Sequence, residues 1–154
     1  MREEAEILGL SSAAALAVTG GALAATLVAI GLASGEMLRH LVQATPVLIA
    51  SLVAWRWPAW GRWALAPVFG FWLFVSLAIW FFLLGLSSPV SGHFNLAERT
   101  LAGALGVLVL MGFALYPRIR GSVGVWSGLA GAAAFAALQV AAFILSTRPE
   151  IATR

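Results

Sequence analysis

Several residue types that support common protein chemistry are missing from this chain. Cysteine is absent, which excludes disulfides, thiol redox chemistry, cysteine-ligated zinc and iron–sulfur clusters. Aspartate and lysine are absent as well, so every acidic side chain is a glutamate and every basic one an arginine. Hydrolysis by an intramembrane aspartate and chemistry by a Schiff-base or phosphate-loop lysine are therefore excluded.

Charge of either sign is also scarce. Charged residues make up 10% of the chain, and residues 7–35, 63–92, 100–117 and 121–147 contain none. Hydrophobic residues make up 62%, whereas soluble domains contain roughly 45–50%. A helix needs about 20 apolar residues to cross the hydrocarbon core of a bilayer. The sequence therefore predicts an all-α, polytopic transmembrane helix bundle that forms a single membrane domain over residues 1–154.

We expect five spans, over residues of about 7–33, 36–55, 64–86, 96–116 and 123–146. The second span has the weakest pattern, because Pro46 interrupts it and its first turn must include Glu36 and His40. The alternative is four spans plus one re-entrant or interfacial helix. The acidic start of the chain is unlike a secretory signal, so we expect the first apolar run to remain as a span.

Small residues form two candidate packing seams. In the first span they recur at every fourth position, which favours close approach of another helix, although an alanine-rich helix can produce this pattern by chance. The fifth span contains a Gly-x-x-x-Gly pattern. The residues we assign to helix packing are Ala17, Gly21, Ala25, Gly124 and Gly128.

Arginine and tryptophan gather between the spans. Tryptophan favours the headgroup level, where its ring is half in the apolar phase and its N–H can find a partner. An aromatic cage for a nucleotide or a cation is the alternative interpretation. The residues that we assign to this interfacial belt are Trp57, Trp60, Arg62, Trp63, Arg118 and Arg120.

The arginine pairs in short connectors also predict the orientation, since such connectors favour the cytoplasmic side. With five spans the N-terminus is then cytoplasmic and the C-terminus periplasmic. Usage rich in arginine, alanine and glycine indicates a bacterial chain, and hence the inner (cytoplasmic) membrane.

Most of the remaining polar side chains are predicted to fall in the periplasmic half. Three interpretations compete: interfacial anchors with one interhelical hydrogen bond, a small ligand or ion crevice with proton-linked groups, or a metal or haem site built on two histidines. We do not expect a metal, because no third histidine exists. The candidate residues are Glu36, His40, Gln43, His93, Glu98 and Gln139.

No catalytic motif accompanies these residues. The sequence contains no nucleophile elbow, zinc-binding His pair, carboxylate dyad or phosphate loop, so we expect no enzymatic activity, no cofactor and no nucleic-acid partner. Two hypotheses follow. The first is an accessory, assembly or scaffold subunit that acts by helix packing in the lipid bilayer, against other membrane proteins or against itself. The alternative is a small membrane transporter or ligand-binding unit with a periplasmic-side polar crevice.

Overall fold

The structure of the protein is a computed structural model that describes residues 2–86, 94–119 and 123–151, with side chains described from Ser12 onward. Five of its helices are long and apolar enough to cross a membrane. The predicted all-α, five-helix membrane bundle is therefore confirmed. The elements are α1 (Arg2–Ser34), α2 (Met37–Arg56), α3 (Pro58–Leu83), α4 (Leu96–Leu115), the short 3₁₀ helix η1 (Tyr116–Arg118) and α5 (Val125–Ser146).

The second segment is a full-length helix in spite of its internal proline. Helix α2 runs without a break from Met37 to Arg56, and Pro46 is buried within it. Proline removes one hydrogen bond of the helix, which a membrane tolerates where neighbouring helices surround the site. The second segment is therefore a candidate span like the other four, and the four-span alternative is not needed.

The turn between α2 and α3 is shorter than the sequence predicts. Only Trp57 separates the two helices, and α3 begins at Pro58. Proline suits the first position of a helix because its fixed φ angle is helical and its missing N–H would have no partner there. Trp60, Arg62 and Trp63 therefore lie in the first turns of α3, whereas the sequence interpretation placed them in a connector before residue 64.

Two glycines end helices in the left-handed conformation that favours glycine. Gly35 follows α1 with a φ of 75°, and Gly85 follows α3 with a φ of 73°. At the second site Leu86 N–H donates to Phe81 O at 2.9 Å and Gly85 N–H donates to Phe82 O at 3.0 Å. This pair of bonds is a Schellman cap, which satisfies carbonyls that the end of α3 would otherwise leave free.

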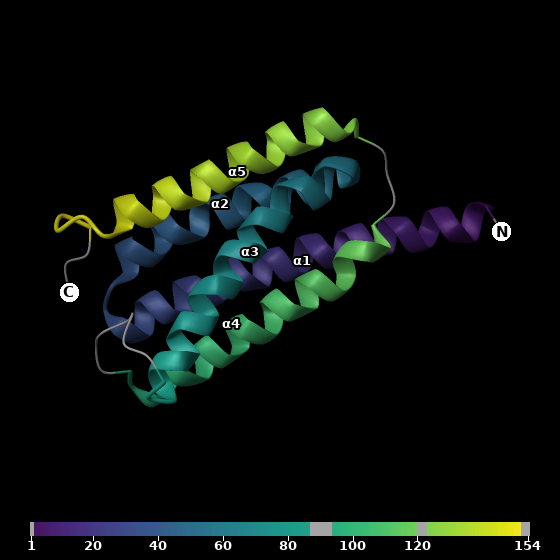
Figure 1. The fold of residues 1–154 in the computed structure, drawn as a ribbon. Helices are drawn as coiled ribbons and strands as arrows, with labels where there is room; N and C mark the ends of the chain where they lie inside the picture. The colour runs from purple at the N-terminus through teal and green to yellow at the C-terminus, as the bar shows by residue number, and fades with distance from the viewer. Residues whose placement is uncertain (1, 87–93, 120–122, 152–154) are drawn as a thin grey trace.

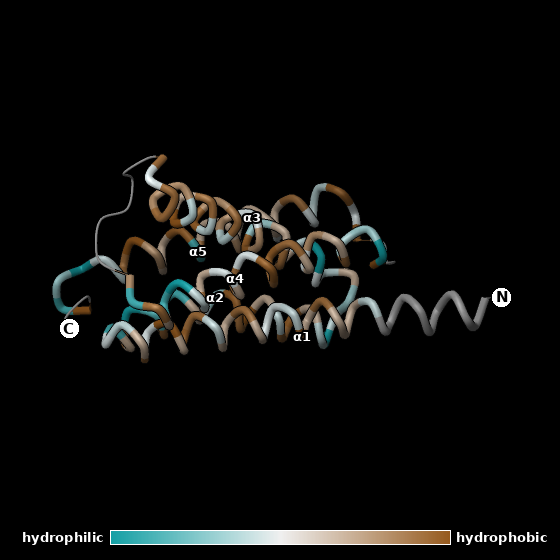
Figure 2. The backbone as a smooth tube through the Cα atoms, turned by 90° about the horizontal axis from the view of Figure 1, so that it is seen from below, coloured by the Kyte–Doolittle hydropathy of each residue, from teal (hydrophilic) through white to brown (hydrophobic). Residues whose placement is uncertain are grey.

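The helices alternate in direction, so the bundle has two distinct ends (Figure 1). Helix α1 packs against α2 and α4, and α3 packs against α2, α4 and α5. Helix α5 packs on α2 and α3, on the side away from α1 and α4. The α1–α2 turn, the start of α4 and the end of α5 lie at one end, and the α2–α3 turn and the start of α5 lie at the other. Hydrophilic residues gather mainly toward these two ends (Figure 2).

The apolar core is built by the first four helices. Its buried side chains are mainly leucine, valine and alanine, with Phe69 and Trp72 from α3. Helix α5 contributes no buried hydrophobic side chain to this core among the described residues. Its buried residues are Gly128, Gln139 and Ser146, which fall on one helical face. Helix α5 therefore joins the bundle through a small and polar face, to which Phe135 and Phe143 add contacts with the other helices.

Candidate functional site at the polar end

Polar side chains from three helix termini meet where α1 turns into α2. We call this region the polar end of the bundle. It combines the start of α2, the start of α4 and the end of α5. Its residues are Glu36, Arg39, His40, Gln43, Asn95, Glu98 and Ser146.

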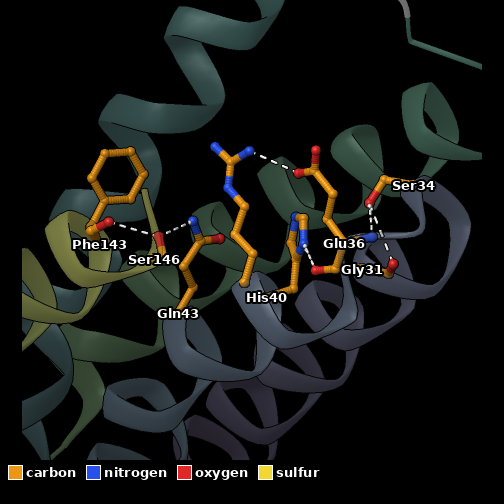
Figure 3. A network of polar contacts seen from close by, with 8 residues as sticks. Gly31, Ser34, Glu36, His40, Gln43, Phe143 and Ser146 are labelled. Atoms are coloured by element: carbon orange, nitrogen blue, oxygen red, sulfur yellow. Dashed lines mark hydrogen bonds and ion pairs between the residues drawn. The ribbon is translucent and has the colours of Figure 1, made fainter. Parts of the chain in front are cut away.

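The α1–α2 turn carries an ion pair and a histidine (Figure 3). Arg39 Nη1 donates to Glu36 Oε2 at 2.7 Å. His40 Nδ1 lies 3.0 Å from Glu36 O. This contact occupies one ring nitrogen, so only Nε2 of His40 remains to bind another group.

His40 is also held by close packing of α1 on α2. A Cβ atom added to Gly31 would lie 2.7 Å from His40 Cβ. Only glycine fits there, because real Cβ atoms do not approach other atoms so closely. Gly31 therefore lets the two helices pack closely next to the turn and fixes the base of the histidine side chain.

A buried hydrogen bond joins α2 to α5. Gln43 Nε2 donates to Ser146 Oγ at 2.9 Å, and Ser146 Oγ donates to Phe143 O at 2.6 Å (Figure 3). Both side chains that form this bond are buried. The bond joins two helices, and its partner on α5 is Ser146, which is not among the candidate residues. Gln139 makes no hydrogen bond with the described residues.

Sequence reasoning missed Ser146, although a signal was available. Ser146 follows Gln139 by seven residues, so the two share one face of α5. Seven residues correspond to about 10 Å along the helix, which places Ser146 closer to the end of the bundle. Gln43, which lies two turns inside α2, therefore meets the serine and not the deeper glutamine.

The start of α4 carries a side-chain cap. Asn95 Oδ1 accepts from Glu98 N–H at 2.9 Å, and Glu98 Oε2 accepts from Asn95 N–H at 2.6 Å. These two bonds form a capping box, which satisfies two free donors at a helix start. Asn95 Nδ2 also donates to Ala33 O at 3.3 Å. The cap therefore ties α4 to the end of α1.

Gln139 is the polar side chain without an assigned role. It is 0% exposed, and neither its Nε2 nor its Oε1 has a partner among the described residues. Trp72 Nε1 and Ser76 Oγ, both on the neighbouring helix α3, are also buried without a partner. A buried amide without a hydrogen bond is unfavourable. Gln139 faces the protein interior, as the cost of placing an amide in lipid predicts.

The metal interpretation depends on His93, which lies outside the described residues. Among residues 2–86, 94–119 and 123–151 no group of three histidine or glutamate side chains is arranged to hold a metal ion. Of the candidate metal ligands that are described, His40 and Glu98 lie in the polar end.

The opposite end of the bundle carries arginine and tryptophan. Arg56 lies over the Trp57 ring with 5.5 Å between Cζ and the ring centroid, and Arg62 lies over the Trp63 ring at 5.3 Å. We call this region, which Trp60 and Arg118 complete, the arginine–tryptophan end. Arg118 donates to the carbonyl of Ala114. Arg120 lies outside the described residues.

Two small residues of α5 are covered by rings from α3. A Cβ added to Gly128 would lie 2.6 Å from Trp63 Cδ2, and one added to Gly131 would lie 3.0 Å from Trp60 Cζ3. Gly128, the second glycine of the Gly-x-x-x-Gly pattern, is thus covered by a side chain of the same protein. Gly124 itself is exposed and precedes the first turn of α5.

The small seam of α1 is divided between the interior and the surface. Ala17 is buried, whereas Ala25 is exposed and a Cβ added to Gly21 would meet nothing within 4 Å. The close approaches are made by Gly31 and by Gly20, whose added Cβ would collide with Ser51 of α2. Gly20 and Gly31 therefore form the close contacts between α1 and α2. Gly21 and Ala25 remain available on the outer surface.

Comparison with known protein families, curated proteins and solved structures finds no match to this chain.

Proposed function

We propose that this protein is a small subunit of the bacterial inner membrane that packs against other membrane proteins, or against a second copy, as an accessory, assembly or scaffold subunit. The main supporting observation is the outer face of α5. Small side chains let another helix approach closely, which favours association between helices in lipid. The exposed small residues on this face are Ala130, Ala133, Ala134, Ala137 and Ala141.

The outer face of α3 has no exposed alanine. It exposes Phe74, Leu77, Trp80 and Phe81, and such bulky side chains keep another backbone away. Helix α5 also exposes bulky side chains, such as Leu138 and Ile144, but its alanines form a row along which another helix can approach. This row favours α5 as the docking side.

The polar end gives further support, because its groups bind one another. Glu36 pairs with Arg39, Asn95 and Glu98 cap α4, and Gln43 reaches Ser146. Groups that already bind one another are less available to a solute, and the bonds from Gln43 to Ser146 and from Asn95 to Ala33 O join helices.

Site-directed cross-linking tests the proposal cleanly, since the chain contains no cysteine. The variant Ala137→Cys carries one thiol on the outer face of α5, and Phe74→Cys carries one on α3 as the matched control. Each is labelled in native membranes with a thiol-reactive photocross-linker. We expect adducts of defined mass from position 137 and few from position 74.

Enlarging the same face supplies the second measurement. Adding Ala133→Leu to the Ala137→Cys variant is expected to lower the adduct yield, because the leucine blocks close approach. Equal yields from both faces, or a strictly monomeric protein with no co-purifying partner, would contradict the proposal.

The alternative function, a small transporter or ligand-binding unit, is favoured by one observation. Gln139 is fully buried with both amide atoms unpartnered, and such a group can bind a polar solute. The test is proton flux into liposomes that contain the purified protein and a pH-sensitive dye. Flux that is absent, or that is unchanged by Gln139→Leu and Glu98→Gln, would remove proton-linked transport as the function.

We further propose that the arginine–tryptophan end faces the cytoplasm. Arg56 and Arg62 flank the short α2–α3 turn, and arginines in such turns favour the cytoplasmic side. The N-terminus is then cytoplasmic and the C-terminus periplasmic. Reporter fusions at each terminus test this orientation, and termini found on the same face would contradict it.

A further inference from the structure

Five of the described arginines fall into two groups by what they bind. Arg39 donates to Glu36, Arg99 donates to Phe94 O, and Arg118 donates to Ala114 O. Arg56 and Arg62 form no hydrogen bond or ion pair with the described residues. Each lies instead over the ring of the tryptophan that follows it.

Stacking holds these two guanidinium groups without using their donors. A guanidinium over an aromatic face is attracted to the ring while its N–H groups stay free at its edge. The Nε atom of Arg62 is buried without a partner. The terminal nitrogens of the two arginines therefore remain as the donors that can bind a group from outside the chain.

The side chains described from Ser12 onward offer these donors no acid. The acidic ones among them are Glu36 and Glu98 of the polar end and Glu150, which follows the end of α5. An acceptor for the arginines must therefore come from outside this set of side chains. At the depth of a tryptophan belt the abundant anionic acceptor is a lipid phosphate.

The surface below the arginines is suited to an acyl chain. Leu48, Leu52 and Trp55 are all exposed on α2. Their spacing of four and three residues places them on one helical face, and Arg56 continues that face from Leu52. A lipid with its phosphate at Arg56 could lay an acyl chain along this face.

We propose that Arg56 and Arg62, at the α2–α3 turn, bind the phosphate of an anionic phospholipid headgroup. The planar guanidinium forms paired hydrogen bonds with phosphate oxygens, which a stacked and pre-ordered arginine forms at a low entropic cost. Phosphatidylglycerol is the probe of choice, because it carries a net negative charge. Phosphatidylcholine, with a neutral headgroup, is its control.

The first test uses the unmodified protein in a mild detergent. Bound lipid is counted by native mass spectrometry, and the thermal unfolding midpoint is measured with phosphatidylglycerol or phosphatidylcholine of the same acyl chains. We expect the protein to retain phosphatidylglycerol but not phosphatidylcholine. The thermal unfolding midpoint should rise only when phosphatidylglycerol is present. Equal effects of the two lipids, or an equal effect of inorganic phosphate alone, would overturn the proposal.

Matched variants locate the site. Arg56→Gln and Arg62→Gln are each expected to weaken phosphatidylglycerol binding about fivefold, and about thirtyfold together, which is the loss of roughly 1 kcal/mol per arginine near an anionic surface. The double variant Arg99→Gln with Arg148→Gln at the other end is the control and should bind as the unmodified protein does. If glutamine impairs folding, Arg56→Lys with Arg62→Lys keeps the charge and should bind with intermediate affinity. Equal losses in the control and test pairs would overturn the proposed location.

Discussion

Helices α1 and α5 are similar in composition and attach to the bundle in opposite ways. In the most apolar stretch of α1 44% of the residues are buried, against 17% in α5. Helix α1 buries Leu16, Leu23 and Leu27, whereas α5 buries Gly128, Gln139 and Ser146. Apolar surface alone does not drive association in lipid, because the acyl chains are as apolar as leucine. Helix α1 is held by interlocking bulky side chains as well as by close approach at Gly20 and Gly31. Helix α5 is held by close approach, ring contacts with α3 and a hydrogen bond.

This difference teaches that the hydropathy of a membrane helix does not indicate its place in the bundle. The mean hydropathy of the α1 and α5 spans is 2.0 in both cases. What differs is the face on which the bulky residues lie. Helix α5 directs its bulky residues outward together with a row of alanines, and directs Gly128, Gln139 and Ser146 inward.

Truncating the inner face of α1 should produce the largest loss. Leu23→Ala removes a side chain that is 0% exposed and leaves a cavity between helices. We expect the free energy of unfolding to fall by about 3 kcal/mol, as for other buried leucines. The measurement is unfolding of the purified protein in mixed micelles with increasing dodecyl sulfate.

The control for this prediction is Leu32→Ala in the same helix, because Leu32 is 67% exposed. It should change the stability little. Similar losses at both positions would show that α1 is not held by the interlocking of its inner face.

Helix α5 should instead be sensitive to enlargement. In Gly128→Leu the new side chain must displace the Trp63 ring, which lies against the glycine. We expect a loss of about 2 kcal/mol, which is typical of overpacking, measured by the same unfolding assay.

Ala130→Leu, on the exposed side of α5, is the matched control and should be close to neutral in the monomer. A neutral Gly128→Leu variant would show that the rings of α3 do not hold α5.

The sequence was sufficient to predict the five helices, because long runs without charge define each of them. The start of α3 differs from the prediction, because arginine and tryptophan are typical of connectors, whereas Pro58 starts the helix earlier. Within the polar end, Asn95 and Glu98 have the three-residue spacing that is typical of a helix cap, and they form one at the start of α4. Ser146 was missed because serine is common in membrane helices, where it often binds the carbonyls of its own helix.

The seam of α1 shows a second limit of sequence patterns. A step of four residues turns about 40° further than one full turn of a helix with 3.6 residues per turn. From Ala13 to Ala25 this drift reaches roughly 120°, so the first is buried and the second is exposed. Which glycine contacts another helix depends on where the two helices cross. The periodicity of the sequence does not give that position.

Removing the polar contact between α4 and α1 should lower the free energy of unfolding by a smaller amount. Asn95→Ala removes both the cap of α4 and the bond from Asn95 Nδ2 to Ala33 O. We expect a loss of about 1 kcal/mol, which is typical of a removed N-cap, in the same unfolding assay. Thr100→Ala is the control, because the Thr100 hydroxyl bonds only to Leu96 O in its own helix. Equal effects of the two substitutions would contradict a role for the cap in joining α4 to α1.

The smallest effect is expected for the polar contact of α5, and a double-mutant cycle on Gln43 and Ser146 measures it. The coupling energy between them should be about 0.6 kcal/mol, the average for hydrogen bonds between membrane helices. The two single variants should differ. Ser146→Ala leaves the buried Gln43 amide without its acceptor, whereas in Gln43→Leu the Ser146 hydroxyl still donates to Phe143 O.

Ser146→Ala should therefore destabilise the protein more than Gln43→Leu does, because stranding a buried polar group costs more than removing it. Thr147→Ala, at an exposed hydroxyl beside the site, is the control. The outcome bears on both helices. A coupling energy near zero would mean that α5 is held by Gly128 and the rings of α3 alone. A value well above 1 kcal/mol would make the polar contact as important to α5 as leucine packing is to α1.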